Sequence, residues 1–297
     1  MFVVTYRKIW FTLSALLIAL SVFGMVKYGF NESIDFKGGT ITEVKYADAA
    51  PSPDDMNARI TALNLGGFSV QPTGDNDYTI RTKDLSQDER AAFMNALSVN
   101  GAAPTVERQN TIGPVAGAEL RSKAEKAVVV VVIMIVLFVT FAFRRVSRPV
   151  SSWKYGLATI IALAHDVIIP TGVFVFLGHY MGTEIDLLFI TGLLAILGYS
   201  VHDTIVVFDR VRENLRLQQK NEPFETTVGK SVSQTFGRSI NTSLTIFITL
   251  MALYLVGSAA TKDFALLLIV GVIVGTYSSI FVASPLLVSF YKWGKTK

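Results

Sequence analysis

The chain has 297 residues, of which 51% are hydrophobic and 17% are charged, and it contains no cysteine. A composition this apolar excludes an ordinary soluble domain, and the lack of cysteine excludes structural disulfides and thiolate metal sites. The formal net charge is only +4, so charge does not indicate a nucleic-acid partner.

Long apolar stretches recur along the sequence. A helix needs about 20 mostly apolar residues to cross a hydrocarbon core about 30 Å thick. Six stretches meet this requirement: residues 9–26, 127–143, 155–177, 185–208, 239–256 and 264–290. The last is longer than one crossing needs, so we expect tilt, a break near Ser284 and Pro285, or an end at the membrane surface. The sequence predicts six transmembrane α-helices, the first retained and not cleaved as a signal peptide.

Basic residues are distributed unevenly between the predicted spans. Residues 144–154 contain four of them and residues 210–230 contain five, and lysines also end the chain. The short connections 178–184 and 257–263 contain only Lys262. By the positive-inside rule, both termini and the two basic loops are expected in the cytoplasm.

Residues 30–122 interrupt the membrane pattern, because they are polar, mixed in charge and numerous enough to form a small domain. The orientation above places this segment on the extracytoplasmic side. Its signals follow the order strand 41–46, helix from 52, strands 68–71 and 78–82, helix 86–99 and strand 105–109. Ser86 with Glu89 three residues later predicts a capping box at the start of the second helix. This order predicts a ferredoxin-like α+β domain with a split βαβ arrangement.

The domain organisation follows from these segments. Residues 1–29 hold the first transmembrane helix, residues 30–122 the extracytoplasmic domain, and residues 123–297 the second to sixth helices with their basic cytoplasmic loops. Residues 119–126 are charged and favour a helix. We therefore expect a helix that crosses from the outer domain into the second span without a hinge.

Asp203 is an acidic residue inside the fourth predicted span, within the sequence GYSVHDTIVVFDRVREN at 198–214. An ionised aspartate in lipid costs about 2.5–3.5 kcal/mol on insertion scales, so Asp203 should face protein, find a partner or carry a proton. Asp209 lies nearer the cytoplasmic end beside Arg210, which is typical of a solvated charge pair. We expect a functional role for Asp203 and an ordinary interfacial one for Asp209.

The fifth predicted span suggests a partner for Asp203. Polar residues follow one another there at intervals of four, three and four: Arg238, Thr242, Thr245 and Thr249. This spacing places them on one helix face, with Asn241 on its flank. Two interpretations stay open, namely hydroxyl groups that join two helices, and a hydrated path in which Arg238 competes with a proton for the Asp203 carboxylate. The second predicts a proton-controlled switch.

His165 and Asp166 form another polar pair, in the third predicted span, with Pro170 one turn later able to free a backbone carbonyl. They could extend the polar path, as could His202 beside Asp203, or Asp166 could simply bond to a neighbouring helix. Two His-Asp dipeptides lack the ligand spacing of a metal site. No metal is therefore expected.

Four motifs give the chain a resemblance to a known family. They are IDFKGGT at 34–40, IGPVAGAEL at 112–120, the sequence at 198–214 quoted above, and FGRSINTSLT at 236–245. Together they resemble the SecD/SecF family of protein-export membrane subunits, part of the resistance-nodulation-division superfamily of proton-driven machines. The resemblance covers essentially the whole chain, and six spans with a large outer loop after the first agree with it.

The resemblance implies a subunit that works with SecD, separate or fused, beside the SecYEG channel in the bacterial inner membrane. Proton flow would move the outer domains and help to pull the preprotein outward after the ATPase SecA has pushed it, with no cofactor and no enzymatic reaction of its own. The family's essential aspartate corresponds to Asp203 and its arginine to Arg238, whereas His202 replaces the asparagine of many relatives. Phe36, Gly38 and Gly39 match the FxGG element, whose role we take as structural.

Two other classes of function remain open. A proton-coupled exporter of small molecules or lipids would also use six helices and a polar stripe. A passive scaffold would only stabilise the export channel and would tolerate a neutral residue at Asp203. Membrane lipid is an expected neighbour in every case.

Overall fold

The computed structural model describes residues 2–47, 50–73, 76–99, 102–144, 150–217, 222–257 and 259–295. Parts of both basic loops, residues 145–149 and 218–221, lie outside this description. The chain divides into two compact units, one formed by Met1–Asn31 with Lys126–Lys297 and the other by Glu32–Glu125. Each unit is described by itself below.

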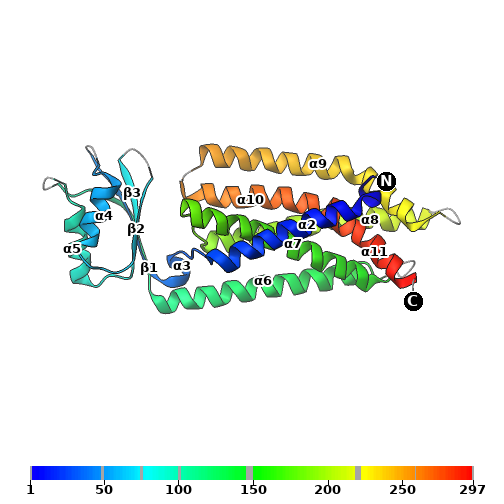
Figure 1. The fold of residues 1–297 in the computed structure, drawn as a ribbon, viewed down its shortest axis with the longest axis horizontal. Coiled ribbons are helices and arrows are strands. Elements are labelled where there is room, and N and C mark those ends of the chain that lie inside the picture. The colour runs from blue at the N-terminus through cyan, green and yellow to red at the C-terminus, as the bar shows by residue number, and fades with distance from the viewer. Residues whose placement is uncertain are drawn as a thin grey trace. The chain divides into compact units, whose positions relative to one another are not determined.

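The first unit is a bundle of long apolar helices (Figure 1). Its elements are α1 (Phe2–Thr5), α2 (Arg7–Tyr28), most of α6 (Pro114–Ala142), α7 (Ser152–Met181), α8 (Leu187–Leu217), α9 (Phe224–Val256), α10 (Ala259–Ser278), the π-helix η1 (Ser279–Ala283) and α11 (Ser284–Lys295). Because α10, η1 and α11 follow one another directly, the described residues contain six stretches long and apolar enough to cross a membrane. The prediction of six spans is confirmed.

Helices α7, α8 and α10 form the centre of the bundle, and α2, α6 and α9 are far less buried. Small residues allow the central helices to approach closely, as is common where lipid surrounds a bundle. A Cβ atom added at Gly271 of α10 would overlap the side chain of Ile196 on α8, and one added at Gly275 would lie 3.1 Å from the Cβ of Ser200. The α8–α10 contact therefore depends on glycine.

The sixth span changes its helical geometry midway. The π-helix η1 ends at Ala283, immediately before Ser284 and Pro285, where the excess length of this span predicts a break. A π-turn contains an additional residue per turn and is frequently found at functional sites. The irregularity is therefore a feature of the bundle interior, and it begins at Ser279.

The second unit is a four-stranded antiparallel sheet with two helices. The elements are α3 (Ile34–Lys37), β1 (Gly39–Lys45), α4 (Pro53–Thr61), β2 (Phe68–Pro72), β3 (Asp77–Thr82), α5 (Gln87–Leu97) and β4 (Thr105–Ile112), with the sheet order β2-β3-β1-β4. Each predicted strand and helix is present. Ser86 and Glu89 form the predicted capping box of α5.

Alternation along the strands gives this unit its core. In β3 the even-numbered residues, such as Tyr78 and Ile80, are buried, and they pack with Met56 of α4 and Phe93 of α5. Tyr46 donates a hydrogen bond of 2.7 Å to the carbonyl oxygen of Leu97. Burial of this ring raises the pKa of Tyr46 to about 12. The hydrophobic effect accounts for the assembly of this unit in water.

Helix α6 belongs to both units, since it begins at Pro114 in the second and ends at Ala142 in the first. Its 29 residues include the charged stretch 119–126. Arg121 is paired with Glu32 at 2.9 Å and with Glu125 at 3.1 Å. The continuous helix predicted for this boundary is present.

Candidate functional site

Asp203 is buried on α8 and its two carboxyl oxygens differ in their surroundings. Oδ1 accepts a hydrogen bond of 2.7 Å from the hydroxyl of Ser239 on α9. Oδ2 is buried and has no well-formed hydrogen bond from any described residue, although Ser279 is close enough to interact with the carboxyl group. A buried carboxyl oxygen without a donor is costly when ionised. Oδ2 is therefore the position at which a proton can be bound.

A second carboxyl group, that of Asp166 on α7, is fully buried but fully hydrogen-bonded. Oδ1 lies 2.8 Å from Nδ1 of His165, and Oδ2 accepts hydrogen bonds from Ser278, at 2.7 Å, and from Ser200. These donors come from α7, α10 and α8. Asp166 therefore joins three helices, and its surroundings are the opposite of those of Asp203.

The two acidic residues belong to one polar cluster. Ser200, which bonds to Asp166, lies one turn before Asp203 on α8. Ser279, which follows Ser278, donates to the carbonyl oxygen of Ser200 at 3.3 Å, and its hydroxyl lies 2.9 Å from that of Thr204. We name the set the acid–serine cluster: Asp166, Ser200, Asp203, Thr204, Ser239, Ser278 and Ser279. It connects α7, α8, α9, the end of α10 and the start of η1 inside the bundle.

Hydroxyl groups extend this cluster between α8, α9 and α10. The hydroxyl of Tyr199 lies 2.6 Å from that of Ser243 and 3.2 Å from that of Thr276. The Ser243 hydroxyl donates to the carbonyl oxygen of Ser239 at 2.7 Å, and Ser239 in turn bonds to Asp203. Three helices are thus joined by hydroxyl groups, which is the bonding expected between helices in lipid.

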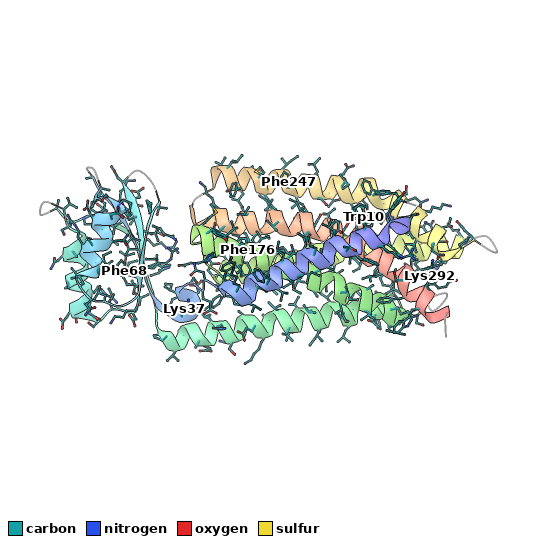
Figure 2. All side chains as sticks on the ribbon, viewed as in Figure 1. Trp10, Lys37, Phe68, Phe176, Phe247 and Lys292 are labelled. Atoms are coloured by element: carbon teal, nitrogen blue, oxygen red, sulfur yellow. The ribbon has the colours of Figure 1, made fainter. Side chains whose placement is uncertain are left out.

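His165 extends the cluster towards α2. Its ring stacks on that of Tyr277 at 5.7 Å between centroids, and its Nε2 is buried with no hydrogen-bond partner among the described residues. The Tyr277 hydroxyl donates to the carbonyl oxygen of Trp10 at 3.0 Å and accepts a hydrogen bond from Ser14 at 3.2 Å. Figure 2 labels Trp10 on α2, and its ring contacts that of Phe281. Polar contacts thus continue from His165 to α2, a direction for which the sequence makes no prediction.

Arg238 does not contact Asp203. The two form no ion pair within 4 Å among the described residues, although the charge of Arg238 is near enough to act on the carboxyl group. Arg238 is exposed on α9, and the next residue, Ser239, lies beside the carboxyl group. Successive helical residues point about 100° apart, so a one-residue difference changes the face completely. The spacing argument identified the correct helix, but the direct contact between Arg238 and Asp203 needs this correction.

The other predicted polar-path residues also lie on exposed surfaces of this chain. They are His202 on α8, and Asn241, Thr242, Thr245 and Thr249 on α9. Thr245 and Thr249 donate to carbonyl oxygens of their own helix, at 2.8 and 3.0 Å. These residues form a polar stripe on α9 outside the buried cluster. The structure brings only His165 and Asp166 of the proposed path into contact with the buried cluster.

Sequence reasoning missed the serines. Ser200, Ser239, Ser278 and Ser279 make most of the hydrogen bonds of the acid–serine cluster, yet single serines are common in membrane helices. The consecutive pair Ser278 and Ser279 in the middle of the longest apolar stretch was the available signal.

Phe36, Gly38 and Gly39 lie at the turn from α3 to β1 in the second unit, which we call the outer unit after the expectation that it lies outside the cytoplasm. Gly38 and Gly39 have φ angles of 76° and 139°, a region that favours glycine. A Cβ atom at Gly39 would lie 2.5 Å from the carbonyl oxygen of Thr82, and one at Gly117 of α6 would lie 2.9 Å from the backbone nitrogen of Gly38. The glycines therefore form a close junction between the turn, β3 and the first turns of α6.

Comparisons with known proteins agree with this arrangement. Residues 93–293 match the family described as "Protein export membrane protein SecD/SecF, C-terminal", and residues 23–50 match "SecD/SecF GG Motif". The Protein translocase subunit SecF of Thermobaculum terrenum is 37% identical over 97% of this chain and 93% of the relative. The Protein translocase subunit SecF of Anaerolinea thermophila is 36% identical over 95% of this chain and 91% of the relative.

A solved structure is similar over nearly the whole chain. The crystal structure of SecDF, a translocon-associated membrane protein from Thermus thermophilus, superimposes with a TM-score of 0.84 at 34% identity. The match covers 98% of this chain and 38% of that longer one. The family matches and near-full-length relatives establish that this chain belongs to the SecD/SecF family of protein-export membrane proteins.

Proposed function

We propose that this chain is an accessory subunit of the Sec protein translocase that uses proton motive force to drive late preprotein translocation. The observation that carries the proposal is the Asp203 carboxyl group. It is buried between membrane helices, and its Oδ2 atom has no hydrogen-bond partner among the described residues. Relatives with the printed name Protein translocase subunit SecF support the translocase assignment. In this proposal Asp203 carries the proton and no cofactor takes part.

Proton binding at Asp203 would change the contact between α8 and α9. The ionised carboxylate accepts a hydrogen bond from Ser239, and protonation weakens this charge-assisted bond. Arg238 precedes Ser239 on α9, so movement of α9 is what would exchange the serine for the arginine beside Asp203. We propose that the two arrangements, Ser239 inward and Arg238 inward, are the two states of the switch.

The driving force is sufficient for such a switch. One elementary charge that crosses about 100 mV releases about 2.3 kcal/mol. Moving a two-state equilibrium from 1:99 to 99:1 takes about 5.5 kcal/mol. Two or three protons per cycle would therefore be enough to drive the change.

SecD is the proposed partner of the exposed polar stripe. Polar side chains within membrane spans face protein or water, because exposure to lipid is costly. In this chain Arg238, Thr242, Thr245 and Thr249 are exposed. The Protein translocase subunit SecDF of Thermus thermophilus aligns with this chain over only 37% of its own length. We propose that SecD covers the stripe, and that SecYEG, SecA and the preprotein are the further partners in the membrane.

The outer unit is proposed to be a ferredoxin-like, split βαβ domain on the extracytoplasmic side. Its antiparallel sheet order β2-β3-β1-β4 supports this assignment. The basic loops support cytoplasmic termini in the bacterial inner membrane. Because α6 is continuous from Pro114 to Ala142, we propose that it transmits helix movement to this domain, which then changes its grip on the emerging preprotein.

The test is the Asp203→Asn substitution in cells that depend on this chain, with Asp209→Asn as the matched control. Asp209 lies on the same helix, but it is exposed and paired with Arg212. At equal membrane levels, Asp203→Asn should cause unprocessed exported proteins to accumulate, whereas Asp209→Asn should not. Normal export with Asp203→Asn would refute the proton-driven role and favour a passive scaffold.

A further inference from the structure

Ser278 and Ser279 are consecutive residues with different hydrogen-bond partners. Ser278 donates to Oδ2 of Asp166 at 2.7 Å and lies 3.0 Å from the carbonyl oxygen of Gly275. Ser279 donates to the carbonyl oxygen of Ser200 at 3.3 Å and lies 2.9 Å from the Thr204 hydroxyl. One serine is therefore bonded to each side of the acid–serine cluster.

The hydrogen bonding of Ser279 explains why Oδ2 of Asp203 has no donor. A serine hydroxyl has only one proton to donate. The Ser279 hydroxyl is placed to donate to the carbonyl oxygen of Ser200, at 3.3 Å. Its remaining interaction with the Asp203 carboxyl group does not have the geometry of a hydrogen bond to Oδ2. Rotation of the Ser279 hydroxyl towards Oδ2 would give this oxygen a hydrogen-bond donor.

The backbone at this point permits such a change. Ser279 is the first residue of η1, and its carbonyl oxygen accepts a hydrogen bond of 3.0 Å from the Ser284 hydroxyl five residues later. A π-turn contains one residue more than an α-helical turn, so a change between the two would alter the relative directions of its side chains. Ser278 immediately precedes the turn, and its hydrogen bond to the buried carboxyl group of Asp166 restrains the helix at this point.

We propose that Ser279 is a positioning residue for proton uptake at Asp203, and that Asp166 holds it in place through Ser278. While Ser278 is bonded to Asp166, Ser279 is held on Ser200 and Oδ2 of Asp203 stays open to a proton. When that bond is lost, Ser279 donates to Oδ2 and stabilises the carboxylate. This inference rests on the proposed proton-carrying role of Asp203 and adds the residues that control it.

Two charged or titratable groups act on Asp203 directly, namely His202 on its own helix and Arg238 on α9. Others belong to the connected hydrogen-bond network: His165 and Asp166 on α7, Tyr199 on α8 and Tyr277 on α10. The residues of η1 carry no titratable side chain, and Lys292 of α11 is paired with Glu225. Replacement of Ser279 leaves the hydrogen bonds of these groups in place. Replacement of Ser278 also removes one donor from Asp166, so the labelled fraction of Asp166 is read from the same spectra.

The experiment measures the protonation of Asp203 directly. Dicyclohexylcarbodiimide reacts with a protonated carboxyl group: the acid adds across one C=N bond, its proton passes to nitrogen, and the resulting O-acylisourea rearranges to a stable N-acylurea with no leaving group. The full chain, assembled with SecD in membrane vesicles, is labelled over a pH series. Mass spectrometry then gives the labelled fraction of Asp203.

Ser278→Ala should shift the labelling curve of Asp203 to lower pH by about one unit, about tenfold in proton affinity, since one hydrogen bond to a charged group is gained. Ser279→Ala should shift it little, because Ser279 does not bond to Oδ2 in the native arrangement. In the double variant the shift should disappear, which is the non-additivity expected of coupled residues. Ser289→Ala, which removes a half-buried serine bonded within α11, is the matched control.

The inference is overturned if Ser278→Ala leaves the curve unchanged, or if its shift survives in the double variant. Should Ser278→Ala fail to assemble, Ser278→Cys keeps the size of the side chain with a weak donor and should shift the curve in the same direction. Labelling does not require export. Normal export with Asp203→Asn would therefore refute the translocation motor, while the labelling curves would still decide the role of the serines.

Discussion

The cores of the two units differ in whether they contain acidic groups. In the outer unit the largest fully buried side chains are Met56, Ile60, Ile80, Phe93 and Leu97, all apolar, and the buried polar side chains among the described residues are uncharged. In the helix bundle, Asp166, Ser200, Asp203, Ser278 and Ser279 are also buried. The buried acidic groups of this chain therefore lie in the unit whose outer surface faces lipid and not water.

The difference follows from the two solvents. In water, apolar burial drives assembly, and a buried polar group only adds cost unless it is bonded. In lipid, apolar side chains gain little by leaving the tails, so close packing and hydrogen bonds must join the helices. The acid–serine cluster therefore joins helices through hydrogen bonds, whereas the core of the outer unit is held together by apolar burial.

The largest effect is expected from Phe93→Ala in the outer unit. Phe93 is 1% exposed in the core between helix and sheet, and truncation of a buried phenylalanine costs about 3–5 kcal/mol. Hydrogen exchange of the β1 and β3 amides in the full chain, in membranes, should show the free energy of opening reduced by this amount.

Asn95→Ala on the same helix is the matched control, because Asn95 is exposed and surface substitutions stay within about 0.5 kcal/mol. Exchange of the α8 amides should be unchanged in both variants. If Phe93→Ala also opened α8, the separation of the chain into two independent cores would be wrong.

A smaller effect is expected at the glycine junction, from Gly117→Ala. The added Cβ would lie 2.9 Å from the nitrogen of Gly38 and 3.0 Å from the oxygen of Phe36, and such overpacking costs about 1–3 kcal/mol. Alanine alone would stabilise the helix by up to about 1 kcal/mol relative to glycine. A net loss of hydrogen-exchange protection in α3 and the first turns of α6 would therefore be due to the close contact.

Gly113→Ala provides the comparison, since a Cβ atom there meets nothing within 4 Å. It should leave export and exchange close to those of the native chain. Equal behaviour of the two alanine variants would contradict the junction. A loss of export in Gly117→Ala with an intact sheet would instead link the junction to transmission along α6.

Much of this architecture could be predicted from sequence, because apolar length and strand or helix signals are local. The six spans, the order of the outer elements and the capping box of Ser86 were of this kind. The face of α9 that meets α8 could not be predicted from the sequence. Periodicity places Arg238 and Thr242 on one face, but it does not say which face contacts α8. The exchange of Arg238 for Ser239, and the roles of Ser278 and Ser279, depend on how four helices pack.

The smallest effect is expected from Glu89→Gln, which tests whether an exposed charge of the outer unit behaves as in an ordinary soluble domain. The bond from Lys83, at 2.8 Å, and that from the backbone nitrogen of Ser86 lower the pKa of Glu89 to about 2, against 4.5 without these partners. A lowered pKa gives stability that is present above pH 4.5 and is lost as the pH falls towards 2. Glu89→Gln should therefore lower the free energy of unfolding of the outer unit at pH 7 and leave it unchanged near pH 2. Unfolding measured at the two pH values checks this. If glutamine lowered the stability equally at both pH values, the shape of the capping box would matter and its charge would not.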